Sequence, residues 1–360
     1  MDNPLGQRLR ELPGPLLLTG HTGFKGTWMT FLLQHLNVSL IGYSLPAEMN
    51  SLYDRAGRTG AIPEVFADIR DYAALEQFID MHKPSTIIHM AAQPLVLKSY
   101  ESPRETFEVN VMGTVNLLDI AFKRDFVKAI IVVTTDKVYR NDNSGQVFKE
   151  TDPLEGKDPY SSSKVGAEAV VAAWQQIAKL SEGPRVVSVR AGNVIGGGDF
   201  ADNRLIPDLI RGIQSGEVVE IRNPESTRPW QHVLDPLIGY LAVLEIKTKG
   251  FEFENYNFGP LGDPISVLDL SKIAHEIFPA LEFELQGPLQ KREAQQEATT
   301  LALNSTLAKE RLGWEPVLDQ KTAIRSTFEW WDRYFRNLKS PTELCIDEIK
   351  SFLVGHTFEG

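Results

Sequence analysis

Short apolar segments alternate with longer segments of helical periodicity through the first half of the chain. The apolar segments cover residues 16–19, 38–43, 65–68, 86–90, 128–133 and 185–190, and the helical segments cover 27–35, 72–82, 103–122 and 160–180. Apolar runs this short are typical of strands buried on both faces, and helices between them supply the crossovers that parallel pairing requires. The pattern therefore predicts an α/β fold with a doubly wound parallel sheet and helices on both of its faces.

A glycine-rich turn follows the first apolar segment directly. It reads Gly20-His21-Thr22-Gly23-Phe24-Lys25-Gly26. In such a turn the first glycine permits a sharp bend, the second lets a pyrophosphate approach the backbone, and the third lets helix and strand pack closely. Amides at the helix N-terminus then bind the phosphates. We therefore expect a dinucleotide to bind here, although an ordinary strand-to-helix turn would also explain the glycines.

After residue 190 the alternation becomes less regular. Helical periodicity covers about 205–215 and 234–244, and a short apolar segment at 256–259 ends in glycine. We expect residues 1–190 to form a Rossmann-like NAD(P)-binding domain and residues 191–360 to form mainly a smaller substrate-binding lobe. Segments near 228–262 are expected to return to the first domain.

Composition narrows the classes of function. The formal net charge is -11, which argues against a general nucleic-acid binder because such proteins need a basic surface. Cys345 is the single cysteine, so no intrachain disulfide can form and a reducing cytoplasm is the expected location. No signal peptide, membrane segment or metal-ligand spacing is recognisable, so we expect neither membrane association nor a bound metal.

A tyrosine and a lysine stand four residues apart in the helical segment near residue 160. Asp158 suits the cap of this helix and Pro159 its first position, which places Tyr160 in the opening turn. Lys164 then lies on the same face, one turn further along. A free phenol has a pKa of about 10, and a nearby ammonium and the positive helix end are expected to lower it. The pair is a candidate general base for an alcohol proton, although surface helices often contain the same spacing.

The turn after the predicted strand at 128–133 carries an acid and an amine. It reads Thr134-Thr135-Asp136-Lys137-Val138-Tyr139. The Thr134 hydroxyl can donate a hydrogen bond to a substrate hydroxyl or to the carbonyl formed from it. Because the C-terminal ends of parallel strands meet at one edge of the sheet, we expect this turn to lie beside Tyr160. A solvated loop would have a similar composition.

Several motifs together resemble the extended short-chain dehydrogenases/reductases of the NAD-dependent epimerase/dehydratase family. They are the glycine turn, His89-Met90-Ala91-Ala92-Gln93, Asn110 and the Tyr160/Lys164 pair. In finer detail, residues 190–199 and 228–233 and the Asp136-Lys137 turn are similar to the CDP-glucose 4,6-dehydratase family, from the first strand to about Trp331. Relatives that act on other sugar nucleotides tend to carry a different residue after the aspartate. Asp136-Lys137 is therefore the most specific indication of the CDP-sugar branch.

The resemblance implies a lyase reaction with an internal hydride shuttle. Tyr160 is expected to remove the proton of the sugar C4 hydroxyl while a hydride passes to the nicotinamide, and Lys164 to bind the cofactor ribose. The C4 ketone acidifies the C5 hydrogen. Lys137 is then the expected base and Asp136 the acid that protonates the departing C6 hydroxyl, and these two roles can be shared or exchanged. Return of the hydride to C6 gives a 4-keto-6-deoxy sugar nucleotide.

The resemblance also implies the site residues. The expected catalytic residues are Thr134, Asp136, Lys137, Tyr160 and Lys164. The expected cofactor-binding residues are Gly20, Thr22, Gly23, Phe24, Lys25, Gly26, Ser44, Asp68, Ile69, Ala91, Ala92, Gln93, Asn110, Tyr160 and Lys164. The expected substrate-binding residues are Gln93, Asn193, Arg204 and Arg228, of which the arginines suit a diphosphate because a guanidinium binds two oxygens at once. Asp68 would equally be explained as a strand-end turn residue, and Arg204 as an ordinary surface residue.

Two departures from the expected pattern concern cofactor and substrate. Folds that prefer NAD usually place an acid after the second strand, where this chain has Tyr43-Ser44 and no arginine for a 2′-phosphate either. The residues leave NAD and NADP open, and the resemblance favours NAD. Residues 296–298 and 303–304 read Gln-Glu-Ala and Leu-Asn where the family commonly has His-Glu-Ala and Leu-Asp.

The expected reaction is conversion of CDP-glucose to CDP-4-keto-6-deoxyglucose, a step of deoxysugar biosynthesis for lipopolysaccharide O-antigen. Alternatives are another NDP-hexose 4,6-dehydratase, a 4-epimerase, and a non-catalytic NAD(P)-binding regulator. Asp136-Lys137 argues against an epimerase, and the Tyr160/Lys164 pair against a regulator. The expected partner is a small sugar nucleotide. By analogy with relatives, the helices at 103–122 and 160–180 are expected to form the interface of a homodimer or homotetramer.

Overall fold

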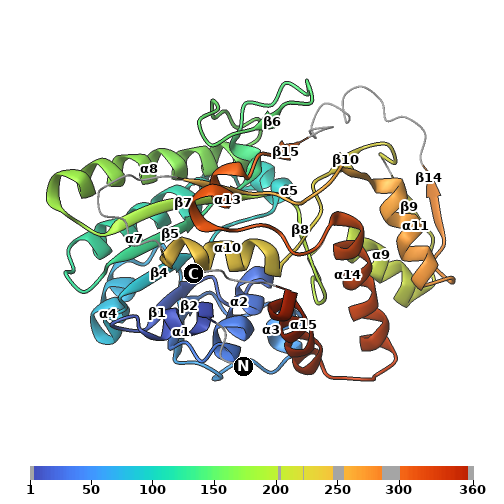
Figure 1. The fold of residues 1–360 in the computed structure, drawn as a ribbon, viewed down its shortest axis with the longest axis horizontal. Helices are drawn as coiled ribbons and strands as arrows, with labels where there is room; N and C mark the ends of the chain where they lie inside the picture. Colours follow the sequence, from blue (N-terminus) through green and yellow to red (C-terminus); the bar gives the residue numbers. More distant parts are fainter. Residues whose placement is uncertain (1–3, 202–203, 222, 246–254, 286–300, 356–360) are drawn as a thin grey trace.

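A seven-stranded parallel sheet forms the centre of the molecule (Figure 1). The computed structural model describes residues 4–201, 204–221, 223–245, 255–285 and 301–355. The strands are β1 (Leu16–Thr19), β2 (Leu40–Ser44), β3 (Glu64–Phe66), β4 (Thr86–His89), β5 (Ala129–Val133), β7 (Arg185–Ala191) and β12 (Tyr256–Phe258). Their order is β12-β7-β5-β4-β1-β2-β3 and every neighbouring pair is parallel. The predicted Rossmann-like sheet is confirmed, and its order reverses between β1 and β4.

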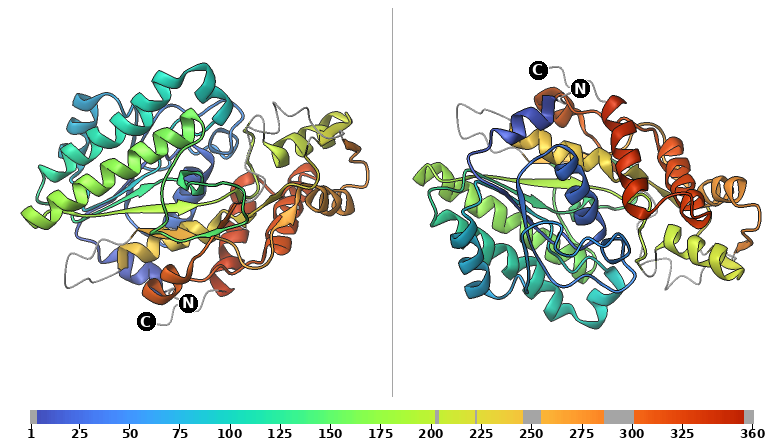
Figure 2. Two further views of the ribbon diagram at one scale, coloured as in Figure 1. Left: turned by 90° about the horizontal axis from the view of Figure 1, so that it is seen from above. Right: turned by 90° about the horizontal axis from the view of Figure 1, so that it is seen from below.

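Alternate side chains of the sheet enter two apolar cores. Leu16 and Leu18 belong to the larger core, and Leu17 belongs to the core on the opposite face. The larger core includes α2 (Phe24–His35) and α10 (Leu234–Glu245), and the other includes α4 (Tyr72–His82), α7 (Gly113–Phe122) and α8 (Pro159–Ser181). Figure 2 shows the two layers, with the green α8 on one side of the sheet and the yellow α10 on the other.

The predicted helix at 103–122 is not one regular helix. It consists of α6 (Pro103–Phe107), a π-helical segment η1 (Glu108–Met112) and α7. A π-helical segment accommodates an additional residue in a turn and is frequent at functional sites. A further short helix, α5 (Val96–Glu101), was not predicted. The helices predicted at 72–82 and 160–180 are confirmed, the first at the same residues and the second within a residue at each end.

The second half of the chain contributes to the sheet and also forms a separate group of elements. β12 pairs with β7 at the edge of the central sheet. Beyond it, Figure 1 shows α9 (Leu205–Ser215), β9 (Val219–Ile221), α11 (Val267–Ile277) and β14 (Phe283–Leu285) at the end of the molecule away from α4. The larger core continues into this half through α14 (Gln320–Phe335), where Trp330 and Trp331 are buried. The expected domain boundary near residue 190 stays a prediction.

In the part of the chain that the structure describes, no helix has both the length and the apolar composition needed to cross a membrane. The same described residues contain no group of three or more His, Cys, Asp or Glu side chains arranged to hold a metal ion.

Candidate active site

The three glycines of the glycine turn differ in how closely other atoms approach them. Gly20 has φ +74°, and a Cβ there would lie 2.6 Å from the amide nitrogen of Ala91. A Cβ on Gly26 would lie 2.1 Å from the Gly20 carbonyl oxygen, so both positions require glycine. At Gly23 the nearest atom to an added Cβ is that same carbonyl oxygen, at 3.5 Å, an ordinary contact distance, so this position is less crowded than the other two. Helix α2 begins at Phe24 with no side-chain cap from any described residue, which leaves its first amides for a phosphate.

Two hydroxyl groups lie at the end of β2, where NAD-binding folds often carry an acid. The Thr22 hydroxyl donates to the Leu45 carbonyl at 3.0 Å and lies 2.8 Å from the Ser44 hydroxyl. Because Thr22 has one hydroxyl proton, Ser44 is the donor in the second bond. This uncharged pair neither repels a 2′-phosphate nor binds ribose through a carboxylate. It therefore does not discriminate between NAD and NADP.

Asp68 and Ile69 lie where an adenine is expected. The Asp68 carboxylate is bound by Arg70 at 2.7 Å, and this hydrogen bond is the main cause of its lowered pKa. The Asp68 carbonyl accepts a hydrogen bond from the Tyr43 hydroxyl at 3.0 Å. Ile69 is buried against Gly113, where an added Cβ would lie 2.7 Å from the Ile69 side chain. The contacts of both residues with an adenine stay predictions.

The loop after β4 is held in place by the strand beside it. The Thr19 hydroxyl oxygen accepts a hydrogen bond from the Ala91 amide at 3.2 Å and lies 2.7 Å from His89 Nδ1. The other ring nitrogen of His89 lies 3.2 Å from the Thr114 hydroxyl, so this buried histidine is satisfied within the protein. Ala91 and Ala92 are half-buried next to the glycine turn.

Gln93 and Asn110 hold this loop against α8. The Asn110 side chain accepts from the Gln93 amide at 2.8 Å and donates to the Gln93 carbonyl at 3.1 Å and the Ser163 hydroxyl at 2.8 Å. The Gln93 side chain is bound to Leu95 and Thr106. Both side chains are buried and engaged within the protein, so they position the loop and the first turns of α8. A direct contact with cofactor or substrate stays a prediction.

Helix α8 begins as its sequence predicts. Asp158 caps it and forms a capping box with Ser161, and Pro159 occupies the first position. Tyr160 therefore lies in the first turn. Lys164, one turn along, is buried and donates to the carbonyl of Val133 at the end of β5, at 3.1 Å. Through this contact, α8 places Tyr160 near the C-terminal end of β5 (Ala129–Val133), just before the turn at residues 134–139.

The predicted lowering of the Tyr160 pKa is wrong for the protein alone. Its pKa is raised to about 12, mainly by burial and also by the charge of Asp136, while a hydrogen bond with the Thr135 hydroxyl and the charge of Arg204 act in the opposite direction. Burial also lowers the pKa of Lys164 to about 8. Loss of water around the phenol outweighs the charge of Arg204 and the Thr135 hydrogen bond, an effect that helix spacing does not reveal.

The threonine that faces Tyr160 is Thr135, and the prediction of Thr134 is wrong. The Thr134 hydroxyl donates to Glu168 at 2.5 Å, on the α8 side of the sheet. The Thr135 hydroxyl donates to Asp136 at 3.0 Å and hydrogen-bonds with the Tyr160 phenol. Successive residues of an extended segment face opposite sides, so the period of two along β5 was the signal that distinguishes the two threonines.

Asp136 is a buried acid with one oxygen left for a ligand. It lies in the short helix η2 (Asp136–Val138) and is 2 % exposed. Its Oδ2 has no hydrogen-bond partner among the described residues. Burial raises its pKa to about 6, against the opposing charges of Lys137 and Arg228. This oxygen is therefore free to hydrogen-bond with a ligand, and its contact with a substrate hydroxyl stays a prediction.

Lys25 extends from the glycine turn towards the same group of side chains. Its ammonium donates to the hydroxyl of Tyr240 on α10 at 3.0 Å. Burial lowers the pKa of Lys25 to about 7, and the charges of Lys164 and Arg204 add to the effect while Asp136 opposes it. The glycine turn and the candidate catalytic residues are therefore electrostatically coupled.

Three of the four expected substrate residues come from separate segments of the second half. Arg204 precedes α9, and its charge acts on Tyr160. Arg228 lies on β10 (Thr227–Arg228), and its charge acts on Asp136. Asn193 precedes β8 (Val194–Ile195), and its carbonyl accepts a hydrogen bond from a backbone amide of β11 (Gln231–His232). The two arginines thus lie around the Tyr160 and Asp136 side chains, and their contacts with a diphosphate stay predictions. Residues 296–298 lie outside the described part of the chain.

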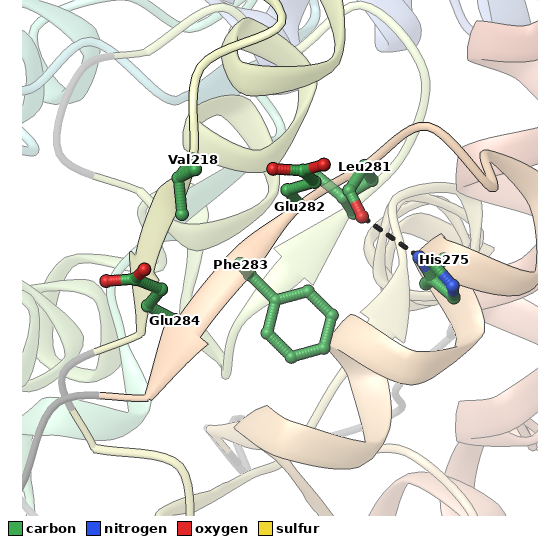
Figure 3. A pocket seen from close by; sticks show the side chains of 6 residues that line it. All are labelled: Val218, His275, Leu281, Glu282, Phe283 and Glu284. Atoms are coloured by element: carbon green, nitrogen blue, oxygen red, sulfur yellow. Dashed lines mark hydrogen bonds between the residues drawn. The ribbon is translucent and has the colours of Figure 1, made fainter.

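A cavity of about 440 Å³ lies elsewhere, between β9, β14 and α11 (Figure 3). It is lined by Val218, His275, Leu281, Glu282, Phe283 and Glu284. His275 Nδ1 donates to the Leu281 carbonyl at 2.9 Å, so this ring is held within its own segment. No lining residue is one of the candidate site residues.

Comparison with known proteins identifies the family. The model of the NAD dependent epimerase/dehydratase family matches residues 16–259. The chain belongs to this family. A CDP-glucose 4,6-dehydratase of Salmonella typhimurium is 38% identical over 329 residues, covering 89% of this chain and 91% of the relative. A dTDP-glucose 4,6-dehydratase of Xanthomonas campestris is 27% identical over 339 residues, covering 88% and 92%. The family resemblance inferred from the motifs is confirmed.

Solved structures share the fold at lower sequence identity. A dTDP-glucose 4,6-dehydratase of Bacillus anthracis in complex with NAD has a TM-score of 0.73 and 23% identity, covering 91% of this chain and 100% of that one. A UDP-glucose 4-epimerase of Thermotoga maritima has a TM-score of 0.74 and 23% identity, covering 90% and 99%. Since enzymes of two activities match equally well, these likenesses establish the fold and leave the reaction to the site residues.

Proposed function

We propose that this protein is a sugar-nucleotide 4,6-dehydratase that converts CDP-glucose to CDP-4-keto-6-deoxyglucose with NAD as cofactor. The observation that carries the proposal is the buried, half-satisfied carboxylate of Asp136, next to Lys137 and linked to Tyr160 through Thr135. Oxidation at C4 requires only the tyrosine and a hydride acceptor. Loss of water across C5 and C6 requires a further acid and base, and this turn supplies them.

The residues at the glycine turn fit the cofactor that the family name implies. The absence of a side chain at Gly23, the first amides of α2 and the Thr22/Ser44 hydroxyls suit a pyrophosphate and its adjoining ribose. The Lys164 ammonium lies one helical turn from Tyr160 and suits the nicotinamide ribose. When bound, NAD supplies a hydride acceptor at C4 and the hydride donor for C6.

Tyr160 is the proposed base for the C4 hydroxyl. A hydrogen bond with Thr135 opposes the rise in the pKa of its phenol. The charge of Arg204 and the hydrogen bond with Thr135 favour the phenolate and offset part of the burial cost. Transfer of the C4 hydroxyl proton to this oxygen, together with loss of the C4 hydrogen as a hydride to the cofactor, would leave a C4 ketone, which acidifies the hydrogen on C5.

Asp136 and Lys137 are the proposed acid and base of the elimination. With a pKa of about 6, Asp136 is protonated in about one molecule in ten at pH 7, which is enough to protonate a departing C6 hydroxyl. Lys137 extends from the same helical turn and is the proposed base for the C5 proton. The two roles can also be exchanged, because both groups reach the site from one short segment.

The CDP-sugar assignment is supported by the Asp136-Lys137 sequence and by the similarity to the Salmonella enzyme. The test uses purified protein incubated in heavy water with CDP-, dTDP-, UDP- and GDP-glucose, and mass spectrometry of the products. We expect CDP-glucose to lose one water and to take up one deuterium. Intact 4-epimers from every donor would reject the proposal, and dehydration of another nucleotide sugar alone would reject only the CDP assignment.

We also propose that the enzyme acts in the cytoplasm, in deoxysugar biosynthesis for lipopolysaccharide O-antigen, as a homodimer or homotetramer. Exposed apolar side chains on α6, η1 and α8 support an interface between copies at these helices. They are Phe107, Met112, Ile177 and Leu180. Light scattering of the eluting protein should give a mass twice or four times that of the chain, and a Leu180→Glu variant should reduce it.

A further inference from the structure

A buried ion pair contacts the turn at residues 134–139, which carries the candidate acid Asp136 and the candidate base Lys137. Glu168 on α8 and Arg190 on β7 are joined by two hydrogen bonds of 2.8 Å, and each side chain is 3% exposed. The remaining capacity of the Glu168 carboxylate is used by the hydroxyls of Thr134, at 2.5 Å, and Ser188, at 2.7 Å. One end of the ion pair is therefore attached to the first residue of the turn.

The other end of the ion pair is attached to the last residue of the turn. Arg190 Nη1 donates to the Tyr139 hydroxyl at 2.7 Å and to the Glu150 carbonyl at 3.1 Å. The Tyr139 hydroxyl in turn donates to Asn257 on β12 at 2.7 Å. Thr134 and Tyr139 bracket residues 135–138, which carry the candidate acid and base. Both ends of this segment are thus fixed to a single buried pair.

The same pair connects the turn to the helix that carries Tyr160. Glu168 follows Lys164 by one turn of α8 and follows Tyr160 by two. Lys164 also donates to the carbonyl of Val133, the residue before the turn. The position of the turn relative to Tyr160 is therefore set by contacts from α8 to both sides of the Val133–Thr134 peptide.

Stability alone does not account for this arrangement. Burying two charges costs desolvation energy, and apolar residues of similar volume often give equal or greater stability. A charged pair with every hydrogen bond satisfied does impose one geometry on the groups around it. Two separate segments must meet on one sugar here, and a displacement of about 1 Å in an active site can reduce a rate about 100-fold.

We propose that Glu168 and Arg190 are positioning residues that hold the Asp136-Lys137 turn in register with Tyr160, so that they control the elimination more than the oxidation at C4. The inference rests on the proposed dehydratase function. The proposed base and the lysine of the oxidation step, Tyr160 and Lys164, are carried by α8, although Thr135 of the turn contacts the phenol, whereas both groups of the elimination, Asp136 and Lys137, lie on the turn. Loosening the connection between them should therefore separate the two steps.

The test removes the connections at the two ends of the turn and leaves the ion pair in place. Thr134→Val removes the hydroxyl that binds Glu168, and Tyr139→Phe removes the hydroxyl that binds Arg190. We expect product formation and solvent deuterium uptake to slow about 10- to 100-fold, while the cofactor is still reduced within about threefold of the normal rate. Reduced cofactor should then accumulate at 340 nm. Thr134→Ser keeps the hydroxyl and should restore elimination.

Thr327→Val is the matched control, because its buried hydroxyl donates at 2.8 Å to a carbonyl of its own helix, α14, in the other half of the chain. It should leave both rates near normal. Equal loss of oxidation and elimination in the Thr134 and Tyr139 variants, or unchanged elimination, would overturn the proposal.

Hydrogen exchange separates this inference from the proposed function. In Thr134→Val and in Glu168→Gln, peptides that cover residues 134–150 should lose protection while peptides of α8 keep it. Unchanged exchange in the turn would reject the positioning role whether or not the protein acts on a sugar nucleotide. If the unsubstituted protein dehydrates no nucleotide sugar, the proposed function is rejected. The hydrogen-exchange result would still decide whether Glu168 and Arg190 position the turn.

Discussion

Replacing Asp136 by asparagine should make the protein more stable while it removes the acid needed for elimination. Burial raises the pKa of this carboxyl from 3.8 to about 6. A shift of about two pKa units means that the ionised form is disfavoured in the folded state by about 3 kcal/mol. Asparagine has nearly the same shape and can still accept the hydrogen bond from Thr135, and it carries no charge.

The size of the effect depends on pH in a defined way. Below about pH 4 the carboxyl is protonated in both states and the penalty is absent. The penalty grows as pH rises from about 4 to 6, because the unfolded chain ionises first, and it is complete above about pH 6. For 360 residues the entropy of unfolding is about 0.75 kcal/mol per kelvin, so Asp136→Asn should raise the melting temperature by about 4 °C at pH 8 and by almost nothing at pH 4.

The assay is thermal unfolding followed by circular dichroism between pH 4 and 8, with turnover of CDP-glucose measured on the same samples. Turnover should fall about 100- to 10,000-fold, the usual contribution of a general acid. Asp125→Asn, the same change at an exposed turn, is the control and should show no pH-dependent difference. A melting temperature that falls at pH 8, or rises equally at both pH values, would refute the account of Asp136 as a buried acid poised for a substrate.

Three further predictions concern the other groups of the site. Tyr160→Phe should abolish turnover and reduction of the cofactor without lowering the melting temperature, and residual oxidation at C4 would contradict its role as base. Lys137→Ala should block deuterium uptake at C5 yet permit reduction of the cofactor at 340 nm, and loss of both would place Lys137 in the oxidation step instead. The pKa of Lys25 is lowered to about 7 by burial, so the protein should bind NAD more tightly at pH 6 than at pH 8. Calorimetric titration of the Lys25→Met variant with NAD should show weaker binding that no longer depends on pH. An unchanged pH dependence would contradict the role of Lys25 as the titrating group.

The sequence predicted the parts of this structure that local patterns determine. Apolar runs and helical periodicity identified the strands and most helices. A strand buried on both faces is a continuous apolar run, and a helix buried on one face has apolar residues at helical spacing. The cap at Asp158 placed Tyr160 correctly for the same reason. The π-helical segment at Glu108–Met112 was missed, since its turn is defined by Asn110 binding Gln93 and Ser163, and neither partner is a helix neighbour.

The two wrong predictions about the site concern properties that depend on the tertiary environment of a side chain. Thr134 and Thr135 are identical in chemistry, and only the direction of each side chain relative to β5 separates them. The pKa of Tyr160 was expected to fall because Lys164 is close in sequence, and it rises because water is excluded. Both depend on how much of each side chain is covered by distant residues, which spacing along the chain does not record.

Because of the π-helical segment η1, the number of residues between Pro103 and Phe122 determines where Asn110 lies. Each residue of an α-helix turns the chain by about 100°, so deleting one residue from Glu108–Met112 would relax the wide turn into a regular helix. Asn110 would then rotate away from the Gln93 backbone and the Ser163 hydroxyl. A shortening by one residue, tolerated on many exposed helices, would here release the loop after β4 and the start of α8 together. Homologues that keep the same site should therefore conserve the spacing between Pro103 and Phe122 more strictly than the exposed residues within it.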